Sequence, residues 1–158
     1  MTNVYLVQHA EAKPEEIDPD RPLSGVGRQH AESVAALANK LGVTVKQIRH
    51  SGKLRAEQTA ELMGKALLPA EGVTAASGLG PLDDVAPVAA DLDEASASVM
   101  LVGHLPFMER LAGYMTAEDA ETPVVDFQNG GIVCLEQQET HWQVRWIITP
   151  AVAEACGS

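Results

Sequence analysis

Short apolar runs rich in β-forming residues alternate with amphipathic helical segments along this chain, and this alternation narrows the folds open to it. Strand-like runs occupy residues 4–9, 45–50, 73–76 and 98–103, and a polar turn joins two more at residues 130–136 and 142–148. Helical periodicity covers the segments between them: a helix after residues 24–27 that ends at Gly42, then residues 52–67, 84–92 and a segment from Pro106 onward. We therefore expect an α/β fold, a three-layer α/β/α sandwich whose mostly parallel sheet carries an antiparallel hairpin at one edge.

The length and composition fit one domain. The chain has 158 residues, of which 46% are hydrophobic, and a chain of this size hides roughly 69% of its unfolded surface when it folds. We expect residues 1–150 to form the domain and residues 151–158 a C-terminal tail. Cys134 and Cys156 form no Cys-x-x-Cys motif, so neither a disulfide framework nor a zinc site is predicted. A buried thiol at Cys134 and a frayed-tail thiol at Cys156 are expected instead.

The formal net charge of -11 argues against polyanionic partners. Aromatic residues are also few, at 4%, so the chain lacks a platform on which bases could stack, and nucleic acid is not an expected partner. No apolar run approaches the length of a membrane-spanning helix and the first residues carry no basic region, so we expect a cytoplasmic protein without membrane contact. The charge is uneven, because nine of the eleven bases lie within residues 1–65. A site for an anionic ligand should therefore draw its cations from that part of the chain.

Two histidines each follow directly on an apolar strand. His9 ends the first run and His104 follows the fourth, while Arg55 lies in the first turn of the helix after the second run, a helix that Ser51 is expected to cap. Ligands bind beyond the carboxyl ends of strands in open α/β sheets, so His9, His104 and Arg55 are expected to meet at one edge. Either histidine alone is explained more simply as a strand-end residue capped by a backbone carbonyl. Their shared position favours a functional site.

The types of side chain predicted at this edge suit a phosphoryl group better than a carboxylate. A helix N-terminus contributes backbone N–H donors and positive dipole, and a guanidinium adds a permanent charge. One imidazole can attack phosphorus while the other hydrogen-bonds the charge that spreads over the equatorial oxygens during transfer.

Four segments of the sequence resemble the histidine phosphatase superfamily. They read Val-Gln-His-Ala-Glu-Ala at 7–12, Arg-Pro-Leu-Ser at 21–24, Ser-Gly-Lys-Leu-Arg-Ala-Glu-Gln-Thr at 51–59 and Val-Gly-His-Leu-Pro at 102–106. The nearest branch is that of the small SixA-type phosphohistidine phosphatases. The resemblance implies a phosphoglycerate mutase-like fold, a nucleophile at His9 that becomes phosphorylated, phosphate-binding arginines at Arg21 and Arg55, and a second active-site histidine at His104. It implies no metal and no organic cofactor.

Gln8 and Ala10 depart from the superfamily's Arg-His-Gly motif. Glutamine offers two neutral donors where arginine offers five and a permanent charge, and loss of one preorganised donor can cost roughly 3 kcal/mol, about two orders of magnitude in rate. We expect Gln8 to hold phosphoryl oxygens with Arg21 and Arg55, at weakened activity or with binding alone. Ala10 is expected to shift the loop if its backbone needs positive φ. Gly52, where many relatives have proline, should loosen the start of the following helix.

The span between Arg55 and His104 holds most of two helices, so no capping domain of the kind found in larger relatives is expected. An imidazole leaving group is far less basic than an alkoxide and needs less protonation, so an open site suits phosphohistidine on another protein. Asp83, Asp84 and Glu11 are candidate general acids, although solvated loop carboxylates explain them more simply. The predicted function is a phosphohistidine phosphatase acting on a signalling protein through phosphorylated His9. A non-catalytic module that binds phosphate or a phosphoprotein, and a small-molecule phosphatase, remain alternatives.

Overall fold

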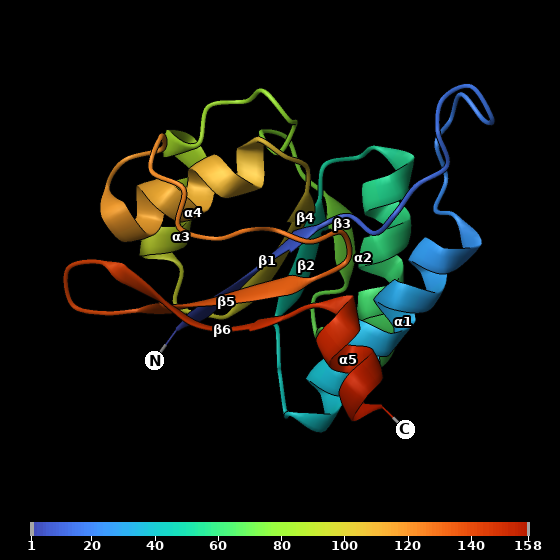
Figure 1. The fold of residues 1–158 in the computed structure, drawn as a ribbon. Helices are drawn as coiled ribbons and strands as arrows, with labels where there is room; N and C mark the ends of the chain where they lie inside the picture. The colour runs from blue at the N-terminus through green and yellow to red at the C-terminus, as the bar shows by residue number, and fades with distance from the viewer. Residues whose placement is uncertain (1, 158) are drawn as a thin grey trace.

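A six-stranded sheet forms the middle layer of the fold, which the computed structural model describes for residues 2–157 (Figure 1). Its strands are β1 (Asn3–Gln8), β2 (Gln47–His50), β3 (Val73–Ala75), β4 (Val99–Gly103), β5 (Ile132–Gln137) and β6 (Trp142–Ile148). They lie in the order β3-β2-β4-β1-β5-β6. The first four pair in parallel, while β5 and β6 are antiparallel additions. The predicted sheet with its edge hairpin is confirmed.

Helices cover both faces of this sheet. Within residues 2–157 they are α1 (Gly25–Lys40), α2 (Leu54–Leu67), α3 (Ala86–Glu94), α4 (Phe107–Ala117) and α5 (Pro150–Cys156). Figure 1 shows α3 and α4 on one face and α1, α2 and α5 on the other. In β1, Val4 and Leu6 pack in the core beneath α3 and α4, whereas Tyr5 and Val7 join the core beneath the other helices. Burial on both faces explains why β1 and β4 are continuous apolar runs.

The turn between β2 and α2 differs from the sequence prediction. The helix begins at Leu54 instead of residue 52, and its N-cap position is occupied by Lys53, which makes no side-chain capping bond. Gly52 has φ +91°, a left-handed conformation that glycine adopts without steric cost. The prediction of Ser51 as the helix cap is therefore wrong, and the Ser51 hydroxyl is left for another partner.

The end of the chain is also more ordered than expected. The sequence predicts a tail over residues 151–158 with a frayed thiol at Cys156, but Pro150–Cys156 form α5. Thr149 caps this helix through its hydroxyl, which accepts from the backbone N–H of Val152 at 3.2 Å. Ala153, which is buried, packs among residues of α1 in the same core cluster. Cys134 is buried, as expected, and Cys156 is exposed.

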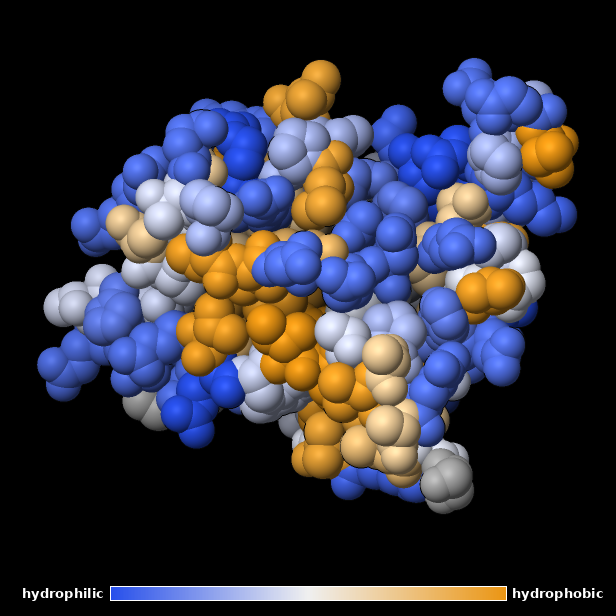
Figure 2. Space-filling view, viewed as in Figure 1, coloured by the Kyte–Doolittle hydropathy of each residue, from blue (hydrophilic) through white to orange (hydrophobic). Residues whose placement is uncertain are grey.

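The surface seen in Figure 2 is mostly hydrophilic, with apolar side chains gathered over the part of the sheet where β5 and β6 run. Val144 and Ile147 of β6 are among the exposed large hydrophobic residues, which is common where a strand forms the edge of a sheet. Within residues 2–157, no helix has both the length and the apolar character needed to cross a membrane.

Candidate active site

The sheet places His9 and His104 side by side. They follow β1 and β4, which are adjacent and parallel, and the last residues of these strands, Gln8 and Gly103, are register partners. The backbone N–H of His9 continues the ladder by donating to the carbonyl of Gly103 at 3.0 Å. The two imidazole rings consequently lie with their centroids 5.1 Å apart and their planes at 54°. His9 and His104 therefore lie together at the carboxyl ends of their strands, as expected from the sequence.

One nitrogen of His9 is held by the backbone and the other is not. Nδ1 lies 2.8 Å from the carbonyl oxygen of Ala10, a bond that requires a proton on Nδ1. The lone pair of the neutral ring is then on Nε2, which is the nitrogen able to attack phosphorus. The pKa of His9 is lowered from 6.5 to about 4, mainly because the ring is buried; the Ala10 bond opposes this effect, and the charges of Arg55 and Arg21 add to it. His9 is thus uncharged at neutral pH, which is the state in which an imidazole can act as a nucleophile.

His104 is almost completely buried, at 2% exposure. Its Nε2 lies 2.6 Å from the hydroxyl oxygen of Ser51, while its Nδ1 is buried without a hydrogen-bond partner among residues 2–157. Burial is the largest cause that lowers the pKa of His104 to about 3, followed by the charges of His9, Arg55, Lys53 and Arg21. A buried ring with an unused nitrogen beside several cations is suited to meet an anion.

The two arginines supply the positive charge. Arg55 is the second residue of α2, and its buried Nε has no hydrogen-bond partner within the described residues. Burial and the charge of Arg21 both lower the pKa of Arg55. Arg21 has φ +50° and donates from Nε to the carbonyl of Lys13 at 3.1 Å, so it closes the base of the loop between β1 and α1. Neither guanidinium group forms an ion pair within residues 2–157, and two such groups favour a multiply charged anion.

Gln8 and Ala10 lie next to this cluster and behave differently from each other. The Gln8 Oε1 is buried without a hydrogen-bond partner among residues 2–157. Ala10 is fully buried and is absent from the residues with positive φ. Its backbone N–H donates to the hydroxyl of Thr59 at 3.0 Å. The expectation that alanine shifts this loop through an unfavourable φ is therefore wrong, because the native conformation suits an ordinary L-residue.

Three polar residues that the sequence analysis did not assign to the site hold its geometry. Ser51 contacts His104, Thr59 joins Ala10 to α2, and Asn129 donates from Nδ2 to the carbonyl of His9 at 3.0 Å. These bonds join residues 49 to 120 positions apart in sequence, so local patterns carry no signal for them.

The candidate general acids are engaged in local turns. Asp83 accepts from the Gly80 N–H at 2.7 Å, Asp84 from the Ala86 N–H at 3.1 Å, and Glu11 from the Ser24 hydroxyl at 2.9 Å. None of the three makes a hydrogen bond or ion pair to His9 or His104 among the described residues. These contacts are typical of carboxylates that shape loops and helix starts.

Two imidazoles facing each other beside two guanidinium groups, at the carboxyl edge of a sheet covered on both faces, define the class of histidine phosphatases. No protein-family model matches the chain, but one curated protein does: phosphohistidine phosphatase SixA of Escherichia coli K12 is 31% identical over 153 residues, covering 89% of this chain and 92% of that protein. The chain belongs to the SixA family of phosphohistidine phosphatases.

Solved structures agree with this assignment. The protein histidine phosphatase SixA, complexed with tungstate, superposes with a TM-score of 0.83 at 25% identity over 94% of this chain and 97% of that one. A SixA structure from Agrobacterium tumefaciens gives a TM-score of 0.76 at 29% identity over the same shares of the two chains. The predicted fold class and the family resemblance are thereby confirmed.

Proposed function

We propose that this protein removes the phosphoryl group from a histidine of another protein by transferring it first to Nε2 of His9. The observation that carries the proposal is the His9 imidazole, which is uncharged, held through Nδ1 by the Ala10 carbonyl, and placed beside His104 and two arginines. Membership of the SixA family, whose E. coli member is named as a phosphohistidine phosphatase, supports the same substrate class.

The reaction has two displacements. In the first, the lone pair of His9 Nε2 forms a bond to phosphorus as the bond between phosphorus and the substrate imidazole breaks, and the departing nitrogen takes a proton from water. In the second, water attacks the phosphorus of phospho-His9, loses a proton to solvent and releases inorganic phosphate with neutral His9. Arg55, Arg21 and Gln8 hold the phosphoryl oxygens, and His104 stabilises the charge that builds on them.

The form of the site supports a protein substrate. Residues 56–103 are used by the remainder of α2, by β3, by α3 and by β4, so no cap lies between the two halves of the site. Imidazole is a weakly basic leaving group, which matches a site whose carboxylates are occupied in turns. We also propose that the protein works in the cytoplasm without a metal or organic cofactor.

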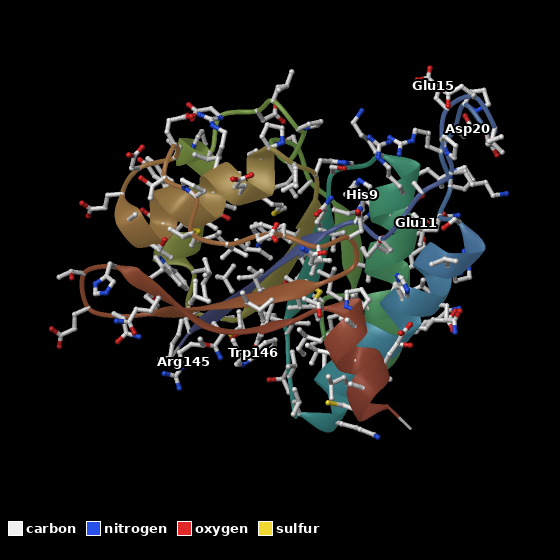
Figure 3. The ribbon with its side chains drawn as sticks, in the orientation of Figure 1. His9, Glu11, Glu15, Asp20, Arg145 and Trp146 are labelled. Atoms are coloured by element: carbon white, nitrogen blue, oxygen red, sulfur yellow. The ribbon has the colours of Figure 1, made fainter. Side chains whose placement is uncertain are left out.

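Charge on the loop between β1 and α1 points to a partner with a basic face. Glu15, Glu16 and Asp20 are exposed on this loop, and Figure 3 shows Glu15 and Asp20 at the tip of a projection beyond His9. The phosphoryl site itself is cationic through Arg21 and Arg55. A phosphohistidine surrounded by basic side chains would meet both charges favourably.

Trapping of the intermediate tests the assignment. After incubation with a phosphohistidine protein labelled on phosphorus, wild-type protein should carry an acid-labile, base-stable label, and His9→Ala should carry none. His141→Ala, which removes an exposed histidine in the β5–β6 turn, is the matched control. If His9→Ala released phosphate as fast as wild type, the nucleophile would be another group.

A second candidate function is a module that binds phosphate or a phosphoprotein without turnover. Gln8 favours it, because a neutral amide stands where the superfamily has arginine. Such a module would bind vanadate and release no phosphate from any substrate. A small-molecule phosphatase, the third candidate, would hydrolyse a sugar phosphate faster than a phosphoramidate. Rates on phosphoramidate, a phosphohistidine protein and a generic phosphate ester separate the three.

A further inference from the structure

Ser51 stands at the closest side-chain contact of the site. Its hydroxyl oxygen lies 2.6 Å from Nε2 of His104, across 53 positions of sequence. This distance lies at the short end of hydrogen-bond distances. The contact is part-buried and His104 is 2% exposed, so water competes little for the His104 ring.

The turn that carries Ser51 is fixed on both sides. His50, which is buried, accepts the backbone N–H of Gly52 on its Nδ1 at 3.1 Å, and the Lys53 N–H points to the Ser51 hydroxyl at 3.4 Å. The left-handed φ of Gly52 reverses the chain between the end of β2 and the start of α2. The Ser51 hydroxyl therefore does not cap the helix through a short bond and faces His104.

We propose that Ser51 is the residue that positions His104 for phosphoryl transfer, by holding Nε2 in a hydrogen bond. An imidazole has two nitrogens, and a partner on one fixes the orientation of the ring and the tautomer that the other presents. Among residues 2–157, Ser51 is the only side chain that hydrogen-bonds the His104 ring, since Nδ1 has no partner. Without it the ring can turn about its side-chain bonds, and its contact with the phosphoryl oxygens becomes less defined.

This inference rests on the proposed function, and its test has one arm that needs no turnover. Ser51→Ala should lower kcat on phosphoramidate by about 10-fold to about 100-fold with a smaller change in KM, because orientation matters most in the transition state. Ser51→Thr, which keeps the hydroxyl, should restore most of the loss. Ser77→Ala, on the exposed loop after β3, is the matched control and should behave as wild type.

Nitrogen NMR of ring-labelled histidine supplies the independent arm. The Nδ1 and Nε2 shifts of His104 should change in Ser51→Ala, return in Ser51→Thr, and stay constant in Ser77→Ala, while the shifts of His141 stay constant in all three. Unchanged His104 shifts in Ser51→Ala would overturn the inference, as would wild-type kcat in that variant. If wild type shows no turnover at all, the proposed function fails, yet the shifts still decide whether Ser51 holds His104.

Discussion

Gln8→Arg tests what the chain loses by carrying a neutral amide next to His9, the proposed nucleophile. Gln8 ends β1, directly before His9, and its Oε1 is buried without a partner among residues 2–157. An arginine there would direct a charged, multiply donating group toward the phosphoryl oxygens. One preorganised donor of this kind is worth roughly 3 kcal/mol in the transition state, so kcat/KM on phosphoramidate should rise by up to about 100-fold.

The same substitution should lower stability when no anion is bound. Arg55 and Arg21 already depress the pKa of His9 and His104 by their charge, and a further cation adds to that repulsion. Two unit charges about 4 Å apart interact by roughly 4 kcal/mol at an effective dielectric constant of about 20. We expect the free energy of unfolding to fall by up to that order, and saturating phosphate or vanadate to recover part of the loss.

Steady-state hydrolysis and urea unfolding, each with and without vanadate, measure the two effects. Gln143→Arg adds the same charge on the exposed edge strand β6 and should change neither. Gln8→Lys separates charge from the two-pronged geometry of arginine. A folded Gln8→Arg variant with unchanged turnover and unchanged vanadate affinity would refute the view that Gln8 faces the phosphoryl group.

Three further predictions concern pH, a buried hydroxyl and salt. Because folding lowers the pKa of His9 to about 4 and of His104 to about 3, the unfolded chain binds more protons below pH about 6.5. The free energy of unfolding should then fall with decreasing pH by up to about 1.4 kcal/mol per unit for each histidine, as urea titrations from pH 7 to 4 will show; a flat profile would contradict the pKa directions. Thr59→Val should lower the free energy of unfolding by about 1–3 kcal/mol and reduce turnover, because the buried Ala10 N–H loses its acceptor. Thr116→Val is the control: it removes a hydroxyl bond within α4 and should cost less stability and leave activity unchanged. Rates on the phosphohistidine protein should fall as salt rises, and a flat or rising profile would argue against a basic partner face.

Much of the fold is visible in the sequence because its elements have local causes. Apolar runs without polar interruptions predict strands buried on both faces, and β1 and β4 are such strands. The ends of helices and strands were harder to predict from the sequence. The run at 45–50 predicted two strand residues before the observed start at Gln47. Val45 is buried like a strand residue, but the paired register of β2 begins at Gln47 with β4 and at Ile48 with β3.

Part of the candidate site could likewise be predicted from the sequence, and part could not. His9, His104 and Arg55 could be predicted because each follows a strand, and strand ends meet in an open sheet. Ser51 was assigned to the wrong partner, because the same serine can cap a helix or reach across the sheet and only the left-handed Gly52 decides between them. Asn129 is recruited from 120 positions away, a contact that no local rule anticipates.

The arrangement of β1 and β4 bears on how such a chain can diverge. His9 and His104 follow strands that are paired on both sides within the sheet. The exposed acidic residues Glu15, Glu16 and Asp20 lie instead on the loop between β1 and α1, and surface loops accept insertions at a small entropic cost. On the proposed function, substitutions in that loop would change which phosphorylated partner binds, while the ladder bond from His9 to Gly103 and the bond from Asn129 to His9 would keep the backbone of His9 in place. Inheritance of the chemistry and inheritance of the specificity are separable in this fold.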